Sequence, residues 1–176
     1  MSDSCLHLYL MRHGQSHLGG VLDDFNRTLT SAGKRAVQRQ ALCLSHPDGI
    51  RPDCIFCSTA KRSRQTAELL FSVFTGTPVF FRESLYLAPA FRILSLLRET
   101  DMIFHRILLV GHTSGLDQLT AVLTNPNTSY HFEPTDCLSL TLSVPKWRDI
   151  HTGSASIDKF YRLPPAQDTF FPKLNH

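Results

Sequence analysis

The sequence predicts an α/β protein, a three-layer α/β/α sandwich with a mostly parallel sheet and an antiparallel edge strand. Three apolar runs, at 6–11, 54–57 and 107–110, have the length and composition of buried strands. Segments with helical periodicity separate them, which favours parallel strands joined by crossover helices. The stretch 156–163 instead alternates apolar and polar residues, as an antiparallel edge strand does.

The remaining elements follow from periodicity and breaking residues. Thr30 or Ser31 can cap a helix over 32–44, and His46-Pro47-Asp48-Gly49 ends it. In a second helix, Ser63, Ala67, Leu70, Phe71 and Phe74 fall on one face. We expect strands at 6–11, 53–58, 79–81, 107–110, 137–144 and 156–163, and helices at 32–44, 59–74, 89–99 and 116–123.

Length and composition indicate an ordinary globular protein. The 176 residues suit one domain, 1–176, with a Pro- and Phe-rich tail at 164–176 along its surface. A net charge of +3 gives no reason to expect nucleic acid, and no apolar run is long enough for a membrane span. No signal peptide is evident, and an odd count of five cysteines favours a reducing cytoplasm. We expect a monomer or weak dimer.

The cysteine and histidine patterns favour neither a metal nor another cofactor. Cys54 and Cys57 form a C-x-x-C with no second pair, inside an apolar run, so we interpret both as core residues. The nine histidines are scattered, and none shows the spacing of a helical zinc site.

Chemistry-bearing residues follow the ends of the strands. Right-handed crossovers place the carboxyl ends of parallel strands at one rim, which would gather Arg12-His13-Gly14, Ser58–Arg62 and Gly111-His112. A neutral imidazole at His13 can attack phosphorus, and the planar guanidinium of Arg12 matches phosphate oxygens. Gly14 lacks a Cβ, so we expect it to let an anion approach closely.

In these residues and their spacing, the chain resembles the histidine phosphatase superfamily, which is also called the phosphoglycerate mutase-like superfamily. The likeness covers residues 6 to about 120, and it is closest to the small single-domain phosphohistidine phosphatases of bacteria. Its matching patches are Arg12-His13-Gly14, Leu29-Thr30-x-x-Gly33, Ser58-x-x-x-Arg62-x-x-Gln65-Thr66-Ala67 and Val110-Gly111-His112. Arg27-Thr28-Leu29-Thr30, Leu85-Tyr86 and Glu133-Pro134-Thr135 resemble segments of the small bacterial members.

The resemblance implies the site. His13 would accept the phosphoryl group, and Arg12, Arg62 and His112 would clamp it, with no metal required. We expect further substrate contacts from Gly14, Gln15, Ser16, Gly111 and Thr113. The general acid is not fixed by the pattern, and Asp23, Asp24 and Glu83 stay open as candidates.

The resemblance also implies an enzyme that dephosphorylates phosphohistidine on a signalling or phosphocarrier protein. A broad phosphatase for small phosphorylated metabolites is the first alternative. A catalytically dead module that recognises a phosphorylated partner is the second, although binding alone needs no nucleophile. An uncertain acid favours phosphohistidine, because a phosphoramidate has a better leaving group than an alkyl ester.

Overall fold

The structure is a computed structural model that describes residues 5–19, 21–127 and 129–164. One six-stranded sheet runs through it in the order β3-β2-β4-β1-β5-β6. Neighbouring strands from β3 to β1 are parallel, and β5 is antiparallel to both β1 and β6. The strands are β1 (Leu6–Arg12), β2 (Cys54–Ser58), β3 (Val79–Arg82), β4 (Arg106–Gly111), β5 (Cys137–Leu142) and β6 (Ala155–Tyr161).

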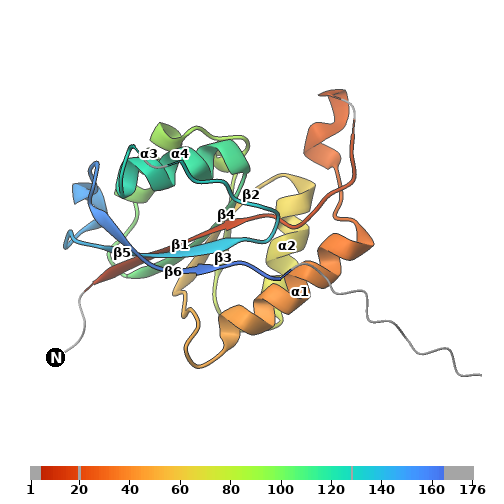
Figure 1. The fold of residues 1–176 in the computed structure, drawn as a ribbon, viewed down its shortest axis with the longest axis horizontal. Coiled ribbons are helices and arrows are strands. Elements are labelled where there is room, and N and C mark those ends of the chain that lie inside the picture. The colour runs from red at the N-terminus through yellow and green to blue at the C-terminus, as the bar shows by residue number, and fades with distance from the viewer. Residues whose placement is uncertain (1–4, 20, 128, 165–176) are drawn as a thin grey trace, which may run out of the picture.

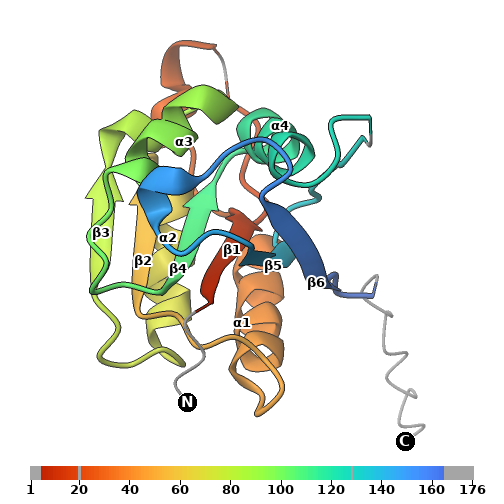
Figure 2. The same cartoon turned by 90° about the vertical axis from the view of Figure 1, so that its left-hand side faces the viewer.

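Helices cover both faces of the sheet, which confirms the predicted three-layer fold. Helices α3 and α4 lie on one face, and α1 and α2 lie on the other (Figure 1). The view in Figure 2 shows the strands side by side, with β3 at one edge and β6 at the other. The helices are α1 (Ser31–Ser45), α2 (Lys61–Phe71), α3 (Ala90–Arg98) and α4 (Thr113–Leu123). In the described residues, short 3₁₀ segments connect β1 to α1, β3 to α3 and β5 to β6: η1 (Val21–Asn26), η2 (Glu83–Leu85) and η3 (Trp147–Asp149).

Strand β1 explains why the central strands are uniformly apolar. Leu8 and Leu10 face the core under α3 and α4, whereas Tyr9 and Met11 face the core under α1 and α2. A strand that is covered on both faces buries every side chain, so polar residues do not alternate with apolar ones. The sequence stays apolar until β1 reaches the rim at Arg12.

Thr30 begins α1 as predicted. Its side-chain Oγ1 accepts a hydrogen bond from the Gly33 N–H at 2.9 Å, and its own N–H donates to the Gln15 carbonyl at 3.0 Å. The cap therefore satisfies a free amide at the helix start and joins α1 to the loop after β1.

Two helix predictions need correction. Helix α4 begins at Thr113 rather than at 116, because extended His112 already acts as its N-cap residue. Helix α2 covers only Lys61–Phe71, and the Phe71 side chain is 48% exposed rather than in the core. Phe71 lies one position past buried Leu70, which rotates it about 100° toward solvent. Buried Phe74 belongs to the turn that follows.

The predicted single domain stays a prediction, and the predicted surface tail falls outside the described residues beyond Pro164. Among the helices of the described segments, none has the length and apolar character to span a bilayer.

Candidate active site

The rim of the sheet brings the two predicted histidines together. Strands β1 and β4 are paired so that Arg12 lies opposite Gly111, which places His13 and His112 at the same level. The His13 N–H donates to the Gly111 carbonyl at 3.2 Å, and the two imidazole centroids lie 5.2 Å apart. Backbone pairing of adjacent strands therefore sets the separation of these side chains.

Arg62 lies in the first turn of α2 and contacts both histidines. Its guanidinium is 1% exposed. The Nε–H donates to His13 Nε2 at 3.0 Å, and Nη2 lies 3.3 Å from His112 Nδ1. The predicted Arg62 is thus placed with His13 and His112 in one hydrogen-bonded cluster.

His13 is a buried, neutral imidazole in a defined tautomer. Its Nδ1–H donates to the Gly14 carbonyl at 2.7 Å, so Nε2 carries the lone pair. Burial lowers the pKa of His13 to about 3, and the charges of Arg62 and Arg12 act in the same direction, while the Gly14 carbonyl opposes them. A neutral ring with an unprotonated Nε2 is the protonation state that a nucleophile requires.

His112 is also neutral. Burial lowers its pKa to about 3, helped by neighbouring His13 and Arg62. Because Arg62 donates to its Nδ1, the other nitrogen carries the proton and donates to Ser58 Oγ at 2.8 Å.

Arg12 keeps an unused donor in the site. Its Nη1 donates to the Phe132 carbonyl at 2.7 Å, which fixes the guanidinium plane. Its Nε is buried and has no hydrogen-bond partner among the described residues. Burial lowers the pKa of Arg12, although a guanidinium stays charged at any working pH. A buried unpaired donor is costly unless a ligand satisfies it, and an anion would do so.

A pocket of about 580 Å³ lies over this cluster. It is lined by Arg12, His13, Gln15, Ser16, Leu18, Asp24, Arg27, Arg62, Leu87, His112, Thr113, Ser114 and Pro134. The pocket contains eight of the twelve residues that the sequence analysis proposed: seven of the nine expected to act in catalysis or substrate contact, and one of the three candidate acids. Its volume is in the range typical of small-ligand sites.

Of the three candidate acids, only Asp24 reaches the pocket. Its carboxylate accepts hydrogen bonds from Arg62 Nη2 at 3.0 Å, Arg27 Nε at 2.9 Å and the Tyr86 hydroxyl at 2.8 Å. Burial acts to raise the pKa of Asp24, but the Tyr86 hydrogen bond and the positive charge of Arg62 lower it to about 2. Asp23 and Glu83 are exposed and do not line the pocket.

The two glycines act differently from the prediction. A Cβ on Gly14 would lie 2.6 Å from Val37 Cγ2. The absence of a side chain therefore allows helix α1 to pack closely against this loop, rather than allowing an anion to approach. The Gly14 N–H donates to Thr66 Oγ1 at 3.1 Å. Gly111 ends buried strand β4, and a Cβ there would meet Leu109 and Leu116. Neither glycine lines the pocket.

Four supporting residues were not proposed as site residues: Ser58, Thr66, Tyr86 and Arg27. The first two hold His112 and Gly14, and the other two hold Asp24. Each lies in a segment that resembled the family, but the resemblance assigned it no role. The sequence signal that could have found these four residues was the resemblance of their segments to the family.

Cys54 and Cys57 are core residues, as predicted. They lie in β2 with their side chains on opposite faces of the sheet. Burial raises the pKa of both thiols, that of Cys54 to about 12. Among the described residues, no group of three or more histidine, cysteine or acidic side chains is arranged to hold a metal ion.

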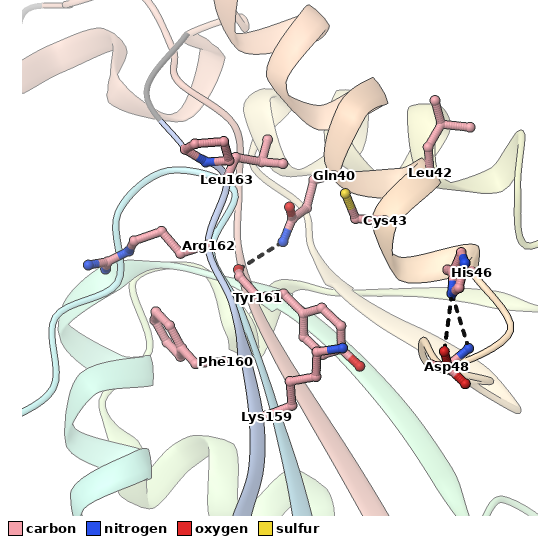
Figure 3. A pocket seen from close by; sticks show the side chains of 11 residues that line it. Gln40, Leu42, Cys43, His46, Asp48, Lys159, Phe160, Tyr161, Arg162 and Leu163 are labelled. Atoms are coloured by element: carbon pink, nitrogen blue, oxygen red, sulfur yellow. Dashed lines mark hydrogen bonds and ion pairs between the residues drawn. The ribbon is translucent and has the colours of Figure 1, made fainter. Parts of the chain in front are cut away.

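A second pocket, of about 530 Å³, lies between α1 and β6 (Figure 3). Gln40 crosses it and donates to the Tyr161 carbonyl at 2.9 Å. His46 and Asp48 pair at its outer end, at 3.6 Å. It contains none of the clustered histidines or Arg62, so the rim pocket is the candidate active site.

Fold and site together define an α/β protein with a cationic, histidine-containing pocket at the carboxyl ends of its parallel strands. Comparison with known families gives the class a name. The model of the histidine phosphatase superfamily (branch 1) matches residues 8–86, which include Arg12, His13 and Arg62. The matched stretch carries three of the four clustered side chains, so the chain is similar to the histidine phosphatase superfamily, and this likeness supports a phosphatase, hence a hydrolase.

Solved structures share the fold. A Nakamurella multipartitia protein, proposed to be the phosphohistidine phosphatase SixA, is 24% identical with a TM-score of 0.78, over 92% of this chain and 98% of that one. The protein histidine phosphatase SixA in complex with tungstate is 20% identical with a TM-score of 0.74, over 88% and 96%. A mycobacterial glucosyl-3-phosphoglycerate phosphatase is 17% identical with a TM-score of 0.67, over 88% and 97%. No curated protein sequence matches the chain.

Proposed function

We propose that the protein is a metal-independent phosphatase that forms a phosphohistidine intermediate on His13 and acts on phosphohistidine of a signalling or phosphocarrier protein. The observation that carries the proposal is the neutral His13 ring, whose Nε2 lone pair lies in a cluster with Arg62 and His112. The structural likeness to phosphohistidine phosphatases supports the substrate class.

The first step is an in-line displacement at phosphorus. His13 Nε2 forms the new P–N bond while the bond from phosphorus to the leaving nitrogen breaks. Arg12 lines the same pocket as His13, and its Nε is an unpaired donor that a phosphoryl oxygen can satisfy. Positive charge at Arg12 and Arg62 stabilises the negative charge on the equatorial oxygens.

In the second step, water attacks phosphorus and the P–N bond to His13 breaks. Inorganic phosphate leaves, and the imidazole returns to its neutral form with a proton on Nδ1. The hydrogen bond from that Nδ1–H to the Gly14 carbonyl keeps the ring orientation through both steps.

The state of the carboxylates favours a phosphoramidate substrate. Asp24 accepts three charged or hydroxyl donors and has a pKa of about 2, so it carries no proton to donate near neutral pH. Asp23 and Glu83 lie outside the pocket. An alkyl ester needs a proton at its leaving oxygen, whereas the nitrogen of phosphohistidine is protonated readily by solvent.

A small phosphorylated metabolite is the alternative substrate. The pocket of about 580 Å³ is large enough for one, and the similar mycobacterial protein is described as a glucosyl-3-phosphoglycerate phosphatase. A binding module without catalysis is the remaining alternative.

Phosphate release from a histidine-phosphorylated carrier protein and from an aryl phosphate separates these functions. We expect rapid release from the carrier, slow release from the ester, and loss of more than about a thousandfold with His13→Ala. His17→Ala, an exposed histidine in the same loop, is the matched control and should retain activity. Fast ester hydrolysis with an untouched carrier would establish the metabolite alternative, and turnover that survives His13→Ala would exclude the mechanism.

A further inference from the structure

The donors of Arg62 are almost fully used in the unliganded site. Its Nε–H donates to His13, and its Nη2 contacts both Asp24 Oδ2 and His112 Nδ1. Its Nη1 donates to the backbone carbonyl of Asp24 at 2.5 Å. A guanidinium has five N–H donors, so one Nη1 hydrogen remains for a ligand.

Asp24 therefore occupies the positions that an anion would take on Arg62. Both its carboxylate and its carbonyl contact the guanidinium of Arg62, which is 1% exposed. Arg27 and Tyr86 hold the same carboxylate from its other side. The side chain is thus a tethered anion within the phosphate pocket.

The contact also affects the nucleophile. While Asp24 holds Arg62, the Arg62 Nε–H donates to His13 Nε2, so the lone pair that would attack phosphorus is engaged. An attacking nitrogen needs that lone pair free. A phosphoryl group can bind Arg62 through more than the one remaining Nη1 hydrogen only if the Asp24 contact opens, and attack also requires the hydrogen bond from Arg62 to His13 to break.

We infer that Asp24 is a specificity-determining residue, an internal carboxylate that a phosphoryl group must displace from Arg62 before His13 can attack. The inference rests on the proposed phosphate site. A free carboxylate cannot displace Asp24 effectively, because it would make the same interactions with Arg62, whereas Asp24 is already held next to Arg62 by the chain. A phosphoryl dianion brings about two charges and three acceptor oxygens, so it can complete the exchange. Asp24 thereby selects phosphoryl groups over carboxylate metabolites.

Asp24→Asn tests this by removing the charge while keeping the size of the side chain and one of its two acceptor oxygens. Calorimetric titration with inorganic phosphate should give a Kd lower by about tenfold or more, since a like charge a few ångströms away is removed. Titration with acetate should show binding that the unmodified protein lacks. Asp23→Asn, at the adjacent exposed position, should leave both titrations unchanged.

Tyr86→Phe provides a second variant with a different local change. It keeps the ring that packs against Phe25 and His112 but removes the hydroxyl that donates to Asp24. We expect tighter phosphate binding than in the unmodified protein, by a smaller factor than in Asp24→Asn.

Two results would overturn the inference. Phosphate binding to Asp24→Asn that is unchanged or weaker would mean that Asp24 only orients Arg62. A loss of ester turnover with unchanged phosphate affinity would make Asp24 a proton donor instead. These titrations involve no turnover, so they are independent of the phosphate-release assay: if release survives His13→Ala, the proposed function fails while the titrations still report on Asp24.

Discussion

At the scale of single residues, the site depends on buried groups that stay neutral. His13 and His112 are 5% and 6% exposed, and burial holds both their pKa values near 3. An unfolded chain lets the same rings protonate near the ordinary histidine pKa of about 6.5. The folded protein therefore excludes protons that the unfolded chain accepts, and the histidines link stability to pH.

The sign of this linkage gives a prediction. Between about pH 6.5 and pH 3 the unfolded state binds more protons, so the free energy of unfolding should fall as the pH falls, by up to about 1.4 kcal/mol per pH unit for each histidine. Urea denaturation at a series of pH values measures this slope. His112→Gln should reduce the slope, and His17→Gln, at an exposed position, should not. Equal slopes in all three proteins would show that neither buried ring controls acid stability.

At the scale of elements, α1 packs closely on the loop that follows β1. The carbonyl of Gln15 accepts from Thr30 at the helix start, and a Cβ on Gly33 would lie 2.1 Å from that same oxygen. The helix can approach the loop only because position 33 has no side chain. Packing of α1 and the position of the His13 loop are therefore coupled.

Gly33→Ala should consequently destabilise the protein, although alanine is the better helix former. Helix propensity alone would stabilise it by about 1 kcal/mol, whereas the backbone overlap with Gln15 should cost about 1–3 kcal/mol or more. Urea denaturation measures the net change, and phosphatase activity should fall with it. Ala32→Gly, at an exposed position of the same turn, should cost no more than about 1 kcal/mol. A Gly33→Ala variant more stable than the unmodified chain would refute this view of the contact.

The same elements show how far sequence reasoning reaches. Arg12, His13, Arg62 and His112 were predictable because each follows or starts an element whose apolar pattern is clear. The contact between Asp24 and Arg62 was not, since it joins residues 38 positions apart through the short segment η1, which has no hydrophobic periodicity. The role of Gly14 was misjudged because a glycine in the sequence does not reveal which neighbour approaches it.

At the scale of the whole molecule, the candidate site and the buried side chain of Trp147 lie at opposite ends of the sheet. Strand β5 starts at the rim, beside Met11, and leads away from it to η3. There Trp147 is fully buried and its indole N–H donates to the Phe104 carbonyl just before β4. This end stabilises the fold without touching the pocket.

Trp147→Phe should therefore separate stability from activity. It removes a hydrogen bond and part of a buried ring, for an expected loss of about 1–3 kcal/mol in the free energy of unfolding. Turnover at a temperature where the variant is folded should stay within about twofold of the unmodified protein. Arg148→Ala, at the exposed neighbouring position, should change neither quantity. A large loss of turnover in folded Trp147→Phe would show that the two ends of the sheet are coupled.

The pairing of β1 with β4 has a consequence for the evolution of this fold. Main-chain hydrogen bonds fix the positions of residues 13 and 112. A substitution at either position therefore removes one imidazole and retains the neighbouring Arg12 and Arg62. On the roles proposed here, one nucleotide change in the codon for His13 would turn a catalyst into a receptor for phosphorylated ligands. After duplication of the gene and such a change, the encoded protein would already be folded and already selective for phosphate.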